Sequence, residues 1–457
     1  MKIIIVGYGK VGYSLAENLS AENNDITVID NDAETLRRAA DDLDVMYVKG
    51  NGVSASALME AGVKNADIVI ATTNSDELNM VCCMMAKKLG AQHTIARIRD
   101  PEYASELNQL MADLALDLVI NPEQAVAAEI VRLLEFPPAI EIETFANGRV
   151  IMAEMKVTAE MAIAGKALRD IAQSGLPSVL IGAVLRGEEV VIPRGDFVIE
   201  SGDIVYVVGR PSHVYDFSRK IGVHVQKIGN VMILGGGRVA YYLAKTLGEM
   251  EMKVKVIEQN RARCEVLTEL LPRALIINGD GTDEKLLLSE NVGDMAGFIA
   301  VTGHDEDNVI SALLAKQFGV KKVIAKINRG AYFSVIKNMP IDNVVSPKAI
   351  TSNHILRYIR GLKNAVGNPV KTLYRLVGGR VEAVEFSVDD LSPLIGRPLK
   401  DLPIADGILI AAIARGNEII IPHGNDEMKQ GDSVILITKD KPLTDLSEIL
   451  QTESAVE

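Results

Sequence analysis

Tryptophan is absent from the 457-residue sequence, and all aromatic residues together make up only 4% of it. We therefore do not expect the aromatic stacking platforms on which proteins bind single-stranded nucleic acid. Basic residues are also in deficit, because 48 Lys and Arg face 61 Asp and Glu, which gives a formal net charge of −13. Such a chain lacks the electrostatic attraction that dominates nucleic-acid binding, and anionic lipid headgroups repel it. We predict that it has no nucleic-acid partner and does not bind a lipid surface directly.

Cysteine and long apolar segments are equally scarce. The three cysteines, Cys82, Cys83 and Cys264, form neither a disulfide framework nor a paired CxxC metal pattern, so we expect reduced core thiols in a cytosolic protein. The first apolar run, residues 3–6, ends at a glycine and predicts a buried strand rather than a signal peptide. No window approaches the roughly 18 consecutive apolar residues of a membrane span, so we predict no direct membrane insertion.

What the sequence does contain is an internal repeat. The glycine-rich motif that begins at Gly7 returns at Gly235, an offset of 228 residues. An offset of 228 or 229 also relates Asp30 to Glu258, Thr73 to Thr302, Arg97 to Lys326, and Pro193 to Pro422. One nearly constant offset across five separated motifs does not arise by chance. We interpret the chain as a duplication of a unit of about 228 residues.

The first part of each unit alternates short apolar runs with helical stretches. The run 68–71, for example, predicts a strand that leads into a helix over 77–89. Strands that alternate with helices of this length indicate βαβ units, and runs with few polar positions indicate strands that are covered on both faces. We therefore predict an α/β fold in which each unit opens with a Rossmann-like, doubly wound parallel sheet.

The second part of each unit is predicted to be a small α+β lobe. Residues 139–145 and 150–157 flank an Asn147-Gly148 turn, which is a hairpin signal. An amphipathic helix over 122–135, stopped by Phe136-Pro137-Pro138, separates the two lobes. The predicted domains are the parallel-sheet lobes 1–122 and 228–347, the crossover helices with their linkers 123–138 and 348–368, and the small lobes 139–223 and 369–453.

The motif at Gly7 predicts a nucleotide site because it follows a strand and opens a helix. In such a GxGxxG motif Gly7 allows the tight turn, Gly9 lets the backbone approach a diphosphate, and Gly12 lets the helix pack on the strand. The intervening residues of the loop are Tyr8, Lys10 and Val11. The helix N-terminus presents amides and its dipole to the phosphates. The alternative is a tight strand–helix turn without a ligand.

Polar residues at the ends of the following strands complete this predicted site. Asp30 closes the second strand, where its carboxylate can accept both ribose hydroxyls and would repel a 2′-phosphate, so NAD(H) or an adenine nucleotide is favoured over NADP(H). Asn51, Thr73 and Asn74 follow the third and fourth strands at the same edge of the sheet. Arg97 ends the fifth strand and can reach the phosphates, with a surface ion pair as the alternative.

The second repeat keeps most of this pattern. Its corresponding residues are Gly235, Gly237, Arg238, Val239, Glu258, Asp280, Thr302 and Lys326. Ala240 replaces the third glycine, which is a tolerated variant of the motif. We predict a second nucleotide site here, with a vestigial turn as the alternative.

No catalytic constellation accompanies these motifs. A dehydrogenase needs an acid or base beside the nicotinamide. Only His304 falls in a ligand-facing loop, and its counterpart in the first repeat is Ser75. The sequence shows no nucleophile elbow, P-loop or metal cluster. We predict a nucleotide-binding protein that is not an enzyme and holds no metal; an NAD-dependent oxidoreductase with duplicated dinucleotide-binding domains is the alternative.

These motifs together resemble the RCK domain, also called the KTN–TrkA-C unit, which regulates potassium channels and transporters. The resemblance rests on the GxGxxG loop, the acidic end of the second strand, the Thr73-Asn74 loop, Ala96-Arg97 in the fifth strand, and the Pro-x-Gly motif at Pro193 in the small lobe. It covers essentially the whole chain. Two such units in one chain resemble the regulatory subunits of bacterial Trk potassium-uptake systems.

The resemblance implies a function and an assembly. It implies a homo-oligomer, a tetramer, that forms a gating ring of RCK units on the cytoplasmic face of the inner membrane, against a Trk-type membrane subunit that translocates potassium. It implies NAD(H) as ligand, with ATP and ADP in some members, and control of potassium uptake by the bound nucleotide. By matching motif, the residues named for the two sites would hold that nucleotide.

Overall fold

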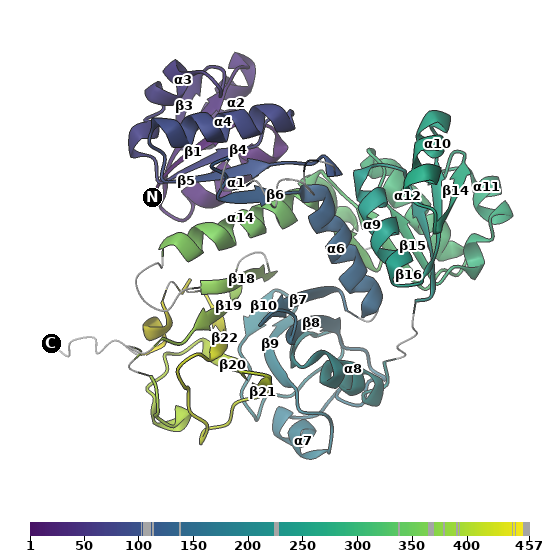
Figure 1. Cartoon of the computed structure of the whole chain (residues 1–457). Coiled ribbons are helices and arrows are strands. Elements are labelled where there is room, and N and C mark those ends of the chain that lie inside the picture. Colours follow the sequence, from purple (N-terminus) through teal and green to yellow (C-terminus); the bar gives the residue numbers. More distant parts are fainter. Residues whose placement is uncertain are drawn as a thin grey trace. The chain divides into compact units, whose positions relative to one another are not determined.

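Contacts within the computed structural model divide the chain into two units (Figure 1). The first unit combines Met1–Val131 with Gly229–Leu356, and the second combines Arg132–Ile228 with Arg357–Glu457. The structure describes residues 1–450 except 102, 104–110, 112–113, 137–138, 224–227, 337–338, 364–369, 378–379, 390–391, 393, 441 and 444. Pro137 and Pro138, which we expected to stop the crossover helix, lie outside the described residues.

The first unit contains one parallel sheet from each repeat. The first sheet has the strand order β3-β2-β1-β4-β5-β6. Its strands are β1 (Lys2–Val6), β2 (Asp25–Asp30), β3 (Met46–Lys49), β4 (Ile68–Ala71), β5 (His93–Arg97) and β6 (Leu118–Ile120). The helices of this repeat are α1 (Lys10–Ser20), α2 (Ala33–Asp42), α3 (Ala55–Glu60), α4 (Asp76–Leu89) and α6 (Pro122–Glu135). The strand order reverses between β1 and β4, and folds of this kind bind ligands at the carboxyl ends of the strands beside that reversal.

The sheet of the second repeat has the same topology, with the order β14-β13-β12-β15-β16-β17. Its strands are β12 (Asn230–Leu234), β13 (Lys253–Glu258), β14 (Ala274–Asn278), β15 (Gly297–Ala300), β16 (Lys322–Lys326) and β17 (Asn343–Val345). Its helices are α9 (Arg238–Glu249), α10 (Arg261–Leu270), α11 (Glu284–Ser289), α12 (Asp305–Gln317), α13 (Phe333–Ile336) and α14 (Pro347–Lys363). The shared strand order confirms the duplicated, doubly wound α/β fold that the sequence predicted.

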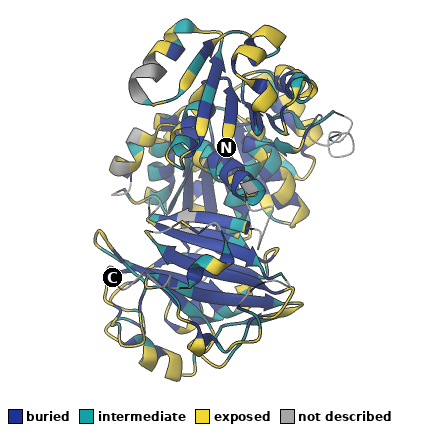
Figure 2. Cartoon of the chain, turned by 90° about the vertical axis from the view of Figure 1, so that its left-hand side faces the viewer, coloured by how far each residue is buried: buried dark blue, intermediate teal, exposed yellow. Residues whose placement is uncertain are grey.

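Burial explains why the short apolar runs form strands. Every residue of β4 and of β15 is buried, as expected for strands that helices cover on both faces. Figure 2 shows the strands mostly buried, with exposed residues mainly on helices and loops. The strand 68–71 has the predicted bounds, and α4 begins one residue earlier than predicted. The strands β6 and β17 were not predicted, because three residues are too few for a periodicity signal.

Within the first unit, each crossover helix contacts the first helix of the other repeat. Asn121, just before α6, donates a hydrogen bond from Nδ2 to the hydroxyl of Tyr242 in α9, at 2.9 Å. In α14, the hydroxyl of Ser352 donates to the hydroxyl of Ser14 in α1 at 3.2 Å. The Nζ of Lys348 lies 5.3 Å from the centre of the Tyr13 ring. The amino end of each crossover helix therefore lies beside the helix that follows the other repeat's glycine loop.

The second unit contains two antiparallel sheets, with the orders β10-β9-β11-β8-β7 and β18-β19-β22-β20-β21. The first repeat supplies β7 (Glu141–Phe145), β8 (Val150–Lys156), β9 (Leu180–Arg186), β10 (Glu189–Val191), β11 (Ile204–Gly209), α7 (Leu168–Gln173) and α8 (Pro211–Lys220). The second repeat supplies β18 (Val370–Leu376), β19 (Val381–Ser387), β20 (Ile408–Arg415), β21 (Glu418–Ile420) and β22 (Ser433–Lys439). Phe145 and Val150 pair across the predicted hairpin turn, where Asn147 and Gly148 both have positive φ. The helix α8 was not predicted.

The two antiparallel sheets share one hydrophobic core. The Phe145 ring of one sheet meets the Tyr374 ring of the other at 5.1 Å between centres, and Ile437 belongs to the same cluster. The second unit is therefore a pair of small lobes that bury their apolar faces together. None of the helices that the structure describes has the length and the apolar character of a membrane span.

Candidate nucleotide-binding sites

Three glycines shape the first loop, each for a different reason. Gly7 has a φ of +92°, and a Cβ added there would lie 2.9 Å from the backbone nitrogen of Thr73. A Cβ at Gly12 would lie 2.0 Å from the Gly7 carbonyl oxygen, so the loop and α1 approach this closely only without a side chain. At Gly9, the N-cap of α1, a Cβ would meet nothing within 4 Å. This open space leaves the first amides of α1 accessible to a phosphate group.

Asp30 lies at the end of β2 and contacts the glycine loop. Its Oδ2 accepts a hydrogen bond from the Tyr8 amide at 2.7 Å, and its Oδ1 accepts one from the Asp32 amide at 2.9 Å. A carboxylate has about four acceptor positions, so positions remain for ribose hydroxyls. The Tyr8 ring is buried and contacts the rings of Tyr13 and Tyr47, at 5.7 and 6.2 Å between centres. Tyr8 therefore offers its backbone, not its ring, to the predicted site.

Asn79 in α4 joins the ends of β4 and β5, and sequence analysis missed it. Its buried side chain accepts at Oδ1 from the amide and the hydroxyl of Thr73, at 2.8 and 2.7 Å. Its Nδ2 donates to the carbonyls of Thr73 and Arg97, at 3.2 and 2.8 Å. Asn308 makes the same four hydrogen bonds in the second repeat. The available signal was a polar residue inside an apolar helix that returns at the offset of 229.

Arg97 ends β5 and is half-buried. Its Nη2 donates to the Thr73 carbonyl at 2.5 Å, whereas its Nε is buried and has no hydrogen-bond partner among the described residues. Burial lowers the pKa of the Arg97 guanidinium. The guanidinium thus bonds a backbone carbonyl at the ligand edge of the sheet, which differs from the surface ion pair that we kept as the alternative. A half-buried guanidinium at this edge can bind an anion through its remaining donors.

The other predicted residues of the first site lie around the same edge. Lys10 is exposed and Val11 is half-buried in the first turn of α1. Asn51 and Asn74 are exposed in the turns that follow β3 and β4. The Asn74 carbonyl accepts a hydrogen bond from Nη2 of Arg99 at 2.5 Å, which ties its turn to the segment after β5. Lys10, Asn51 and Asn74 are thus exposed around the edge where the sequence predicts a ligand, and neither asparagine is part of the packed core.

In the second repeat the predicted residues line one cavity of about 450 Å³. They are Gly235, Gly237, Arg238, Val239, Glu258, Asp280, Thr302 and Lys326. Glu258 accepts hydrogen bonds from the amides of Gly236 and Asn260, at 2.6 and 2.7 Å, as the acidic residue of the first repeat does. A Cβ at Gly237 would again meet nothing within 4 Å. The loop therefore has the open approach that a diphosphate needs, and the carboxylate has acceptor positions left for a ribose.

Charged groups of the first repeat also reach the second site. Glu123, near the start of α6, lines the cavity, and its Oε2 is buried without a hydrogen-bond partner among the described residues. Arg238 forms an ion pair with Asp100, with 3.9 Å between Nη2 and Oδ2. Burial lowers the pKa of Lys326, and the Glu123 carboxylate partly offsets this effect. The same carboxylate partly offsets the effect of burial on Arg97. Sequence analysis missed Glu123, because only a tertiary contact brings α6 to the second repeat.

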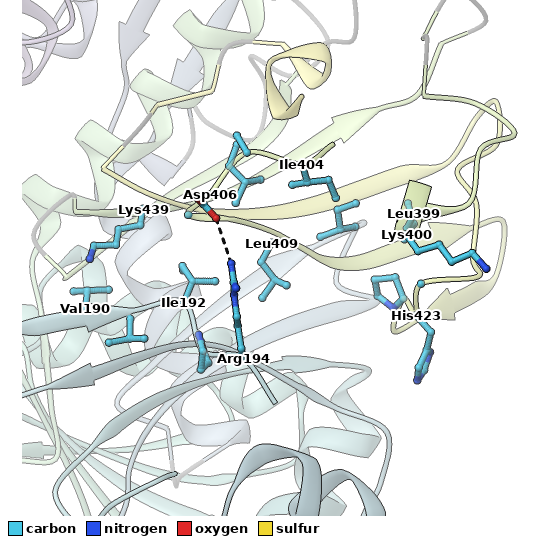
Figure 3. A pocket seen from close by; sticks show the side chains of 18 of the residues that line it. Val190, Ile192, Arg194, Leu399, Lys400, Ile404, Asp406, Leu409, His423 and Lys439 are labelled. Atoms are coloured by element: carbon cyan, nitrogen blue, oxygen red, sulfur yellow. Dashed lines mark hydrogen bonds and ion pairs between the residues drawn. The ribbon is translucent and has the colours of Figure 1, made fainter. Parts of the chain in front are cut away.

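The second unit contains a separate cavity of about 550 Å³ (Figure 3). Segment 189–194 of the first repeat lines it together with segments 404–410 and 422–424 of the second. Arg194 and Asp406 form an ion pair there at 3.2 Å, but both side chains are largely exposed, so the pair adds little stability. None of the residues predicted for the nucleotide sites lines this cavity.

The sequence matches two family models, each of them twice. The TrkA-N domain model matches residues 3–122 and 231–347, and the TrkA-C domain model matches residues 152–222 and 383–451. A Trk system potassium uptake protein TrkA homolog 1 of Methanosarcina mazei is 37% identical over 446 residues, which are 96% of this chain and 97% of the relative. The Trk system potassium uptake protein TrkA of Vibrio alginolyticus is 36% identical over 457 residues, 99% of each chain.

Solved structures share the fold at low sequence identity. The GsuK RCK domain has a TM-score of 0.63 and 18% identity, and covers 96% of this chain and 92% of its own. The GsuK channel bound to NAD has the same score and identity, over 96% of this chain and 76% of its own. GsuK bound to ADP has a TM-score of 0.51 and 14% identity, over 78% and 69%. At these identities the likeness shows the RCK fold alone. The two domain models and the near-full-length relatives show more: this chain belongs to the TrkA family of Trk-system potassium uptake proteins.

Proposed function

We propose that the protein is a nucleotide-sensing regulatory subunit of a Trk-type potassium-uptake system. The observation that carries this proposal is the second glycine loop, whose eight predicted residues line one cavity of about 450 Å³ beside an open helix N-terminus. The relatives that cover nearly the whole chain are Trk-system potassium uptake proteins, which supports potassium uptake as the regulated process.

The proposed ligand is NAD(H), with ATP and ADP as further regulatory ligands. The residues fit such a ligand, because Gly9 and Gly237 leave space for phosphates that a Cβ would fill. Asp30 and Glu258 keep acceptor positions for a ribose and disfavour a 2′-phosphate. GsuK, which shares the fold, is described as bound to NAD in one structure and to ADP in another, and this supports both ligand classes.

In this proposal the chain forms a homo-oligomer, a tetramer, that builds a gating ring on the cytoplasmic face of the membrane against a potassium-translocating subunit. A nucleotide can shift the ring between two shapes only through different affinities for them. The sites are suited to this role, because each lies where strand ends, a glycine loop and the other repeat's crossover helix meet. A ligand that fills such a junction stabilises one arrangement of the repeats over another.

The structure favours a sensor over the oxidoreductase alternative. A duplicated catalytic unit would keep a proton-transfer residue at both sites. His304 lines the second cavity, but the equivalent Ser75 caps α4, where its hydroxyl accepts from the Leu78 amide at 3.1 Å and donates to Glu77 at 2.6 Å. Ser75 is thus committed to the start of the helix and is not an acid or base for a nicotinamide.

Equilibrium binding of NADH, NAD, ATP and ADP to the full-length protein tests the proposal, with stoichiometry per chain. Gly9→Val and Gly237→Val should each abolish binding at one site without a steric clash inside the protein, because both positions have open space around the Cβ. Gly229→Val is the matched control, because Gly229 is exposed, has the same open space and lies at the opposite end of β12. Undiminished binding in the double variant would refute the site assignment, and steady NADH turnover would support the oxidoreductase.

A further inference from the structure

The two crossover helices begin with equivalent residues of opposite charge. The segment Val119-Ile120-Asn121-Pro122-Glu123 corresponds to Val344-Val345-Ser346-Pro347-Lys348, which likewise spans a short strand end and the first two helical residues. Glu123 and Lys348 therefore occupy the same place in α6 and α14. Each of these helices contacts the other repeat. Glu123 of the first repeat therefore lies at the second site, and Lys348 of the second repeat lies beside the first site.

Glu123 is placed inside the second site. It lines the same cavity as Gly237 and Lys326, and its Oε2 is buried without a hydrogen-bond partner among the described residues. The Glu123 carboxylate partly offsets the effect of burial on the pKa of Lys326 in the second repeat and of Arg97 in the first, but it is the cavity of the second repeat that Glu123 lines. This carboxylate adds negative charge at the place where a nucleotide's phosphates would lie.

Lys348 is placed beside the phosphate-binding helix of the first site. Its Nζ lies 5.3 Å from the centre of the Tyr13 ring, and the Tyr13 amide donates to the Gly9 carbonyl at 2.9 Å. The hydrogen bond between Ser352 and Ser14 fixes α14 against the same helix. The ammonium group therefore lies next to the first turn of α1, where the amides and the helix dipole already favour anions.

Other differences between the two repeats also make the second site more acidic than the first. Four carboxylates line the second cavity: Glu123, Glu258, Asp280 and Asp307. The equivalent positions around the first site hold Lys348, Asp30, Asn51 and Leu78. Only one of these four positions is therefore acidic at the first site, and one is basic. Asp100 also neutralises the loop cation Arg238 of the second site, whereas the equivalent Lys10 is exposed.

We propose that this asymmetry gives the two sites different ligands, so that the first site selects the nucleotide with the most phosphate charge and the second selects the less charged dinucleotide. The inference rests on the proposed function, because it requires that both sites bind nucleotides. ATP carries more negative charge than ADP, AMP or NAD(H), and its added charge lies on the terminal phosphates. Lys348 attracts that charge, and Glu123 repels it.

The test measures AMP, ADP and ATP binding at one site at a time in the full-length protein. Gly237→Val isolates the first site and Gly9→Val isolates the second. In the first background, Lys348→Glu should reduce the ATP-to-AMP affinity ratio about tenfold, equivalent to about 1.4 kcal/mol, and Lys348→Gln should reduce it less. In the second background, Glu123→Lys should raise the same ratio about tenfold. Both effects should shrink as salt is added.

Lys88→Glu is the matched control, because Lys88 is exposed near the end of α4 that is remote from the ligand edge. It should leave both ratios unchanged. An ATP-to-AMP ratio that Lys348→Glu and Glu123→Lys do not alter, in proteins that still bind nucleotide, would overturn this inference and leave the proposed function intact. Absence of nucleotide binding from the unmodified protein would instead overturn both.

Discussion

The buried asparagine of α4 offers the sharpest test of how the first site is held together. Asn79→Ala removes four hydrogen bonds, three to Thr73 and one to the carbonyl of Arg97. A typical hydrogen bond contributes roughly 0.5–1.5 kcal/mol net, and a buried polar group left without a partner costs roughly 1–3 kcal/mol. Since a methyl group cannot replace any of these contacts, we expect the variant to lose about 3 kcal/mol of stability in the first parallel-sheet lobe.

Thr73 and Arg97 lie at the edge of the sheet where we propose that the ligand binds, so nucleotide affinity should fall together with stability. Thr73 and Arg97 would lose the side chain that fixes their relative position, and nucleotide affinity at the first site should fall about tenfold, equivalent to about 1.4 kcal/mol. Hydrogen exchange measured peptide by peptide is the appropriate assay, because it reports on each lobe separately. The amide of Thr73, whose acceptor is the Asn79 side chain, should lose most of its protection.

The second repeat supplies the control for this prediction. Asn308→Ala removes the same four hydrogen bonds there, so it should destabilise the second lobe by a similar amount and weaken only the second site. Asn79→Asp keeps the acceptor but loses the donor, so it should have a smaller effect than Asn79→Ala on Thr73 protection. Unchanged exchange at Thr73 in Asn79→Ala, or equal loss of affinity at both sites, would refute the reasoning.

Three further predictions follow from single positions. Gly12→Ala places a Cβ 2.0 Å from the Gly7 carbonyl oxygen, so the free energy of unfolding should fall by about 1–3 kcal/mol in thermal unfolding. An unchanged melting temperature would contradict this prediction. Burial raises the pKa of Cys82 to about 12, so iodoacetamide at pH 8 should label it only after unfolding, and rapid labelling of the native protein would contradict this. Arg186 helps to lower the pKa of Asp203 through two 2.8 Å hydrogen bonds, so the stabilisation is complete above the ordinary aspartate pKa and is lost as the pH falls below it. Asp203→Asn should remove that part of the acid dependence, as urea unfolding across pH 2 to 6 would show.

The sequence determined the features that depend on neighbours along the chain. The constant offset revealed the duplication, and the βαβ pattern gave the parallel sheets with most strand and helix ends within a few residues. The positive φ of Gly7 and the close approach of Gly12 to the Gly7 carbonyl follow from local backbone geometry, which the motif specifies by itself. The Asn147-Gly148 turn likewise produced its hairpin. Such features are readable because the interactions that create them span few residues.

Only the tertiary structure decided what joins distant segments. Asn79 looked like one polar residue in an apolar helix until the fold placed it between β4 and β5. The sequence did not predict that Glu123 and Lys348 lie at the other repeat's glycine loop, because a helix sequence does not indicate which repeat the helix will contact. Their sites depend on packing between residues more than 100 positions apart, such as Asn121 against Tyr242 and Ser352 against Ser14. The sequence therefore determined two similar glycine-rich loops, and the contact of each crossover helix with the other repeat placed a carboxylate at one loop and an ammonium group beside the helix of the other.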